Sequence, residues 1–97
     1  MHPNVTKVLN AVRQNFNCLG YSVKEAGRES VLHLPHLVSM PSFSRDEQRE
    51  QIQMLTEIAI KESKVAGVTF TLRDTNGLEG GQRNWHHFYV EIRIPKE

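Results

Sequence analysis

The sequence has little cysteine, since Cys18 is the only one among 97 residues. A lone cysteine excludes an intramolecular disulfide and any zinc site built on paired cysteines. No apolar run approaches the roughly 20 residues that a membrane-spanning helix needs, and Met1 to Leu9 lack the unbroken apolar stretch of a signal peptide. We therefore expect a cytoplasmic protein that does not associate with membranes.

The sequence also lacks an excess of charge of one sign. Twelve Lys and Arg residues stand against eleven Asp and Glu, which leaves a net charge of +1. Such a chain has no global electrostatic attraction for nucleic acid, so a DNA-coating role is excluded and any phosphate contact needs a local patch. A chain of 97 residues can build one hydrophobic core but not two. The sequence thus predicts a single domain spanning residues 1–97.

Two segments have the periodicity of amphipathic helices. Apolar residues recur at three- and four-residue intervals from about Asn4 to Cys18, and we expect Asn4 to cap the start of this helix. A second helix is predicted to start after Ser44, which forms a capping box with Glu47, and to end near Val65. The residues expected on its inward face are Ile52, Leu55, Ile58 and Ala59.

Four segments, 21–24, 31–34, 68–73 and 88–94, alternate apolar and polar residues and predict strands. The first two are joined by a turn at Gly27. We predict an α+β fold in the order α-β-β-α-β-β, a two-layer sandwich with two helices packed on one face of a four-stranded, mainly antiparallel sheet. This order is a circular permutation of the ferredoxin-like layout, an analogy of architecture that implies no function.

The segment between Pro35 and Pro41 is expected to be neither strand nor helix, although it is rich in apolar residues. It either folds over the open end of the core or forms a docking loop for a partner. The residues of this candidate docking loop are Leu37, Met40 and Phe43.

Residues suited to catalysis or metal binding are present but poorly placed. His86 and His87 are neighbours in sequence, and neighbours on a strand point to opposite faces, so we expect no metal site. Asp74 and Glu91 lie on successive strands, as in some metal-dependent nucleases, yet Arg93 stands where such sites need a lysine. A nuclease is therefore our third hypothesis, with no cofactor expected, and an enzyme is less favoured than a binding protein.

The connection between the last two strands gathers residue types that favour binding. Tryptophan, tyrosine and arginine contribute most of the energy at protein interfaces. Our leading hypothesis is a non-enzymatic binding module, a small accessory or inhibitory protein of the kind that phages and mobile elements encode, which docks onto a larger protein or nucleoprotein complex. The predicted partner-binding residues are Arg73, Arg83, Asn84, Trp85, His86, His87 and Tyr89.

Three alternatives to this interpretation stay open. Trp85 could cap the edge of the sheet, which would leave the rest of the connection as a hairpin tip. The exposed sheet face could bind RNA or single-stranded DNA, with aromatic rings stacking on bases and arginines on phosphates. An exposed edge strand could also pair with the same strand of a second copy of the chain and form a homodimer. The residues of the nucleic-acid alternative are Tyr89, Trp85, Arg73, Arg83 and Arg93.

Overall fold

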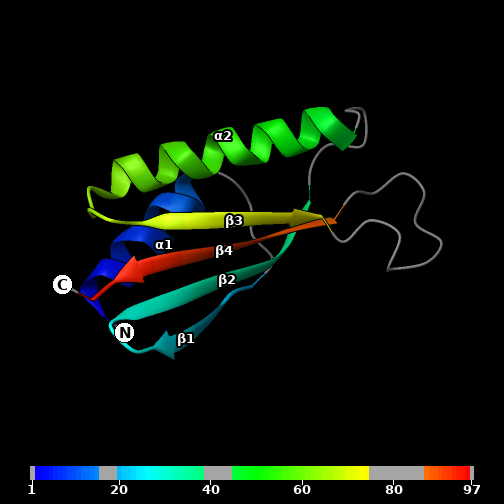
Figure 1. Ribbon diagram of the computed structural model, residues 1–97. Coiled ribbons are helices and arrows are strands. Elements are labelled where there is room, and N and C mark those ends of the chain that lie inside the picture. The colour runs from blue at the N-terminus through cyan, green and yellow to red at the C-terminus, as the bar shows by residue number, and fades with distance from the viewer. Residues whose placement is uncertain (1, 16–19, 39–44, 75–86, 97) are drawn as a thin grey trace.

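A computed structural model describes residues 2–15, 20–38, 45–74 and 87–96 (Figure 1). It contains two helices and a four-stranded antiparallel sheet, which confirms the predicted α+β class. The elements, in chain order, are α1 (Pro3–Asn15), β1 (Ser22–Ala26), β2 (Glu29–Val38), α2 (Arg45–Ser63), β3 (Thr69–Asp74) and β4 (His87–Pro95).

The strands are arranged in the order β1-β2-β4-β3, and every neighbouring pair is antiparallel. The last strand of the chain therefore lies inside the sheet, between the hairpin β1-β2 and β3. In the pairing register Leu32 lies opposite Ile92 on β4, and Phe70 of β3 lies opposite the same residue from the other side. β1 and β3 form the two edges of the sheet.

The hydrophobic core lies between the helices and one face of the sheet. In Figure 1, α1 lies behind the sheet and α2 runs along β3, so the face turned toward the viewer carries no helix. Burial of these apolar side chains is the main favourable term in folding. The buried hydrophobic residues are Val5, Val8, Leu9, Ala11, Val12, Leu32, Leu34, Ile52, Ala59, Phe88, Val90, Ile92 and Ile94.

The start of α1 differs from the expectation that Asn4 caps it. The helix begins at Pro3, whose fixed φ suits the first helical position. The backbone N–H of Asn4 donates to Nδ1 of His2 at 3.1 Å, so His2 satisfies this amide. The side-chain amide of Asn4 instead donates to the carbonyl of Pro95 at 2.9 Å, which ties the start of the first helix to the end of the last strand.

Strand β2 is longer than the sequence predicts, because it continues through Pro35 to Val38. The expectation that residues 35–38 are outside any strand is therefore wrong. The register shifts between Leu34 and Leu37, an irregularity that leaves Pro35 without a paired position. Proline lacks an N–H and is tolerated in a sheet at such a bulge, which explains how the strand passes through it.

Helix α2 has a more polar buried face than predicted. Ile52 and Ala59 are buried as expected, but Ile58 is 39% exposed, so its predicted inward position is wrong. Thr56 takes part in the buried face because its hydroxyl donates to the carbonyl of Ile52 at 2.7 Å. A threonine that bonds within its own helix can be buried at low cost, and apolar periodicity does not reveal it.

The turn after α2 depends on backbone conformations that favour glycine. The helix ends at Ser63, two residues before the predicted end, and Lys64 has a positive φ of 60°. Gly67 also has a positive φ, of 76°, and a Cβ at this position would lie 3.1 Å from Cγ of Pro95. Gly67 thus permits both the turn and the close approach of β4.

In the part of the chain that the structure describes, no helix is both long and apolar enough to cross a membrane.

Candidate functional site

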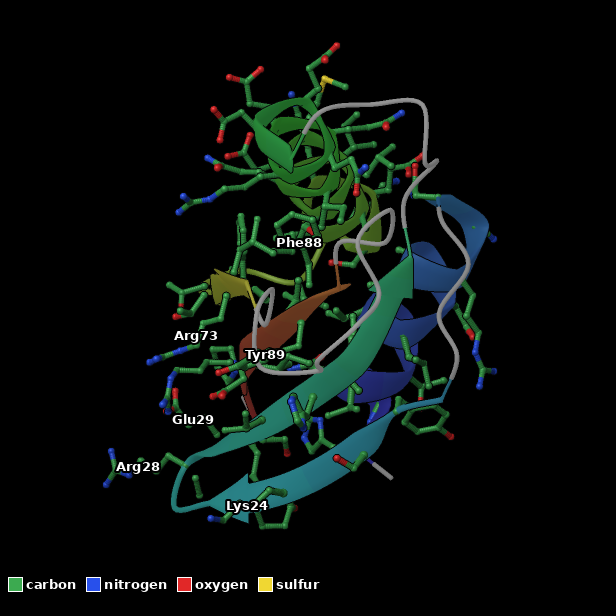
Figure 2. All side chains as sticks on the ribbon, turned by 90° about the vertical axis from the view of Figure 1, so that its right-hand side faces the viewer. Lys24, Arg28, Glu29, Arg73, Phe88 and Tyr89 are labelled. Carbon is green, nitrogen blue, oxygen red and sulfur yellow. The ribbon has the colours of Figure 1, made fainter. Side chains whose placement is uncertain are left out.

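The face of the sheet away from the helices is the largest surface on which the described strands present polar side chains. Figure 2 shows Arg73, Tyr89 and Lys24 on the side of the sheet opposite both helices. Side chains alternate between the two faces of a strand, so every second residue belongs to this surface. We call it the open face, and its residues are Ser22, Lys24, Glu29, Val31, His33, Thr69, Thr71, Arg73, Tyr89, Glu91 and Arg93.

An aromatic pair lies at one end of the open face. The rings of His33 and Tyr89 meet edge to face, with centroids 5.4 Å apart and an angle of 86° between their planes. Both residues are half-buried by the neighbouring strands. Aromatic pairs with this geometry stabilise each other, so the pair presents a fixed rather than a freely rotating surface.

Arg73 lies directly opposite Tyr89 in the register between β3 and β4. Its side chain is exposed, and among the residues whose side chains the structure describes no acid forms an ion pair with it. Directly opposed residues on one face have Cβ atoms about 5 Å apart. The sheet therefore places an exposed guanidinium beside a half-buried phenol, at the end of β3 and β4 that is nearest in sequence to residues 75–86.

The other end of the open face carries neutralised charge. Nη1 of Arg93 lies 3.0 Å from Oε1 of Glu29, and the two side chains are 49% and 39% exposed. Exposed ion pairs contribute little to stability, typically about 0–1 kcal/mol. Glu91 lies between Arg93 and Tyr89 along the same face of β4, since these residues alternate with buried ones. The open face therefore mixes both signs of charge.

A second polar group lies at the edge formed by β1. The hydroxyl of Ser30 donates to Oε2 of Glu25 at 2.7 Å, and Nζ of Lys96 lies 3.1 Å from Oε1. The hydrogen bond from Ser30, followed by the contact with Lys96, lowers the pKa of Glu25 below its ordinary value. A carboxylate with a lowered pKa stays ionised at neutral pH and is a poor general acid or base. This group links the chain's end to the sheet rather than forming a reactive site.

The structure brings together only part of the predicted partner-binding set. Arg73 and Tyr89 are neighbours, and His87 starts β4 opposite Val38. Leu37 is part of β2 and pairs with Phe88, so it lies in a strand and not in a loop. The remaining predicted residues lie outside the described residues; these are Arg83, Asn84, Trp85, His86, Met40 and Phe43.

The acidic pair of the nuclease hypothesis is not brought together by the strand register. Asp74 pairs with Phe88, whereas Glu91 pairs with Thr71, three positions further along β3. Three strand positions span about 10 Å, and positions that differ by an odd number belong to opposite faces of the sheet. Among the described residues, no group of three His, Cys, Asp or Glu side chains is placed to hold a metal ion.

Sequence reasoning missed several members of the open face. Lys24, Glu29 and His33 join it because the hairpin β1-β2 pairs with β4, which the sequence pattern does not specify. Alternation within each strand was the available signal, but it indicates only that these residues share a face, not which strands lie beside them.

No family model, curated protein or solved structure matches this chain.

Proposed function

We propose that this chain is a non-enzymatic binding module of the cytoplasm, an accessory or inhibitory protein that binds a protein partner through the open face. In this proposal the chain is a two-layer sandwich, in which α1 and α2 form one layer and the sheet forms the other. The observation that supports it most is the pairing of exposed Arg73, which has no ion pair among the described side chains, with half-buried Tyr89 on a sheet face that carries no helix.

The composition of the open face favours a protein partner. Tyr89 and Arg73 are residue types enriched where interface energy is concentrated. Tyr89 is held by its contact with His33, so little side-chain entropy is lost when a partner covers it. Thr69 and Thr71 provide exposed hydroxyls on the neighbouring strand, as expected for the polar rim of an interface.

The same face is less suited to a nucleic acid. A phosphate backbone that followed β4 from Tyr89 toward Arg93 would pass the carboxylate of Glu91. Arg93 is already neutralised by Glu29 at 3.0 Å, and a phosphate would have to displace this contact. Affinity for single strands depends on several unneutralised cations acting together, whereas the described part of this face alternates cations with acids.

The test combines partner capture with two substitutions. The chain is crosslinked and captured from lysate, the partner is identified by mass spectrometry, and the affinity of the purified pair is measured. Arg73→Glu and Tyr89→Ala are each expected to weaken binding at least about 30-fold, which corresponds to the roughly 2 kcal/mol loss that defines an interface hot spot. Lys24→Glu, an exposed reversal at the β1 edge of the face, is the matched control and should have a smaller effect.

Two outcomes would contradict the proposal. The first is unchanged affinity of the Arg73→Glu variant with circular dichroism identical to that of the parent chain. The second is binding of labelled single-stranded RNA or DNA at low salt that weakens steeply with salt and depends on Arg73. That result would support the nucleic-acid alternative instead.

A further inference from the structure

The two edges of the sheet differ in their protection against pairing with another strand. β1 spans five residues and carries the charges of Lys24 and Glu25, which discourage edge-to-edge association. β3 also carries two charges, Arg73 and Asp74, but they are its last two residues, and the four residues before them, Thr69 to Leu72, have none. Natural proteins usually protect exposed edges with charges, proline or very short strands, so Thr69 to Leu72 form a stretch of edge that lacks this protection.

A groove accompanies the β3 edge, between it and the flank of α2. Its volume is about 400 Å³, and its apolar part is formed by Ile60, Val68 and Phe70, all half-buried. Two opposite charges flank it, since Glu57 and Lys61 lie one helical turn apart on α2. Both are exposed, and within the described residues neither forms an ion pair.

We propose that a second copy of this chain occupies this edge, with its β3 antiparallel to the first and a two-fold axis at Phe70. In this register Phe70 faces Phe70 of the second copy, Thr69 faces Thr71, and Val68 faces Leu72. Apolar residues thus meet apolar residues on the groove side, and threonines meet on the open face. Cross-strand aromatic and threonine pairs of this kind stabilise antiparallel sheets, and a two-fold interface requires such self-complementarity.

The positions of the two charged residues on α2 are compatible with the same two-fold axis. Glu57 and Lys61 line the same groove as Phe70, and they are separated by about 6 Å along the helix axis. A two-fold axis between the two charges therefore brings Glu57 to Lys61 of the second copy, and Lys61 to Glu57. This charge complementarity favours a second copy over an extended peptide of another protein, which would have to supply both charges itself.

The dimer would join two sheets into one and place two open faces side by side. It would therefore present two Arg73–Tyr89 pairs to partners in a two-fold arrangement. A bivalent partner would bind such a surface more tightly than a single face, without any new contact. The dimer itself depends on β3 and α2 alone and does not rest on the proposed role of the open face.

The test is the mass in solution as a function of concentration, measured by sedimentation and light scattering from about 1 µM to about 1 mM, the range of transient interfaces. We expect the mass to rise toward twice the 11.2 kDa of the chain. Glu57→Lys and Lys61→Glu should each weaken the dimer at least tenfold, because each places two pairs of like charges across the axis. The double variant should restore it, and Lys7→Glu, an exposed reversal on α1, should leave it unchanged.

Hydrogen exchange provides a second readout at the strand itself. The β3 amides should exchange more slowly at high than at low protein concentration, whereas those of β1 should not change. A monomer at every concentration would overturn the inference. Single charge reversals without effect on the dimer, a double variant that fails to recover it, or a monomer that binds extended peptides at β3 would overturn it as well.

Discussion

At the scale of single residues, Glu25 shows how an exposed acid can be held ionised. Ser30 is buried and donates its hydroxyl to the carboxylate at 2.7 Å, while Lys96 approaches from the end of the chain at 3.1 Å. Both contacts favour the charged form and lower the pKa of Glu25. A group whose pKa is lower in the folded than in the unfolded chain stabilises the fold above its unfolded pKa.

The pH dependence that follows can be measured directly. Replacing Ser30 with Ala removes the largest cause of the shift, so the pKa of Glu25 should rise toward its ordinary value of 4.5. In the parent chain the stabilisation should be lost as the pH falls below about 4.5 through the folded pKa, and this loss should be smaller in Ser30→Ala. The measurement is a pH titration of the side-chain carboxyl by NMR, together with unfolding at each pH. An unchanged pKa in Ser30→Ala, relative to the Thr71→Ala control, would contradict the assigned cause.

At the scale of elements, burial separates residues that look equivalent in sequence. Ile92 lies on β4, one of the two inner strands of the sheet, and its side chain is fully buried. Ile58 lies on α2 and is 39% exposed. The two isoleucines have the same hydrophobicity, but only the first is surrounded by core side chains from both layers.

Matched truncations should expose this difference. Ile92→Ala should lower the free energy of unfolding by about 2–5 kcal/mol, the usual cost of a cavity in a packed core. Ile58→Ala should lower it by less than about 1 kcal/mol, because solvent can fill the space and alanine favours the helix. Urea denaturation of both variants measures the difference. Equal losses would mean that the described packing of α2 is wrong.

At the scale of the whole molecule, contacts join residues near the start of the sequence to residues near its end. The side-chain amide of Asn4 donates to the carbonyl of Pro95 at 2.9 Å, and the backbone N–H of Lys96 donates to the carbonyl of Arg28 at 3.0 Å. Val8 of α1 and Ile92 of β4 belong to the same buried cluster. The first helix and the last strand therefore depend on one another.

We expect this chain to unfold as one cooperative unit, as a single domain over residues 1–97 requires. NMR methyl signals of Val8 and Ile92 should disappear at the same urea concentration, and this midpoint should coincide with the loss of far-ultraviolet circular dichroism. If the signal of Val8 disappeared first, α1 would be an independent or weakly attached element. That result would contradict the shared core.

The local pattern of apolar residues was sufficient to predict the helices and strands, but not to predict where each of them ends or which residues are buried. The spacing of apolar residues predicted both helices and all four strands, since periods of 3.6 and 2 residues come from backbone geometry alone. It failed at Pro35, where a bulge allows β2 to continue, and at Ile58, where Thr56 replaces it in the buried face. At Pro35 the register of β2 against β4 decided the outcome, whereas on α2 a polar residue, Thr56, entered the buried face because its hydroxyl is bonded to the carbonyl of Ile52.

By itself the sequence determined the fold class, the number of elements and the alternation that brings Arg73 and Tyr89 to polar faces of their strands. Only the tertiary structure decided that β4 lies between β2 and β3, that Arg73 is opposite Tyr89, and that a groove accompanies the edge of β3. The reason is physical: residue periodicity arises from neighbouring residues, whereas strand order and register arise from pairing between residues far apart in the chain.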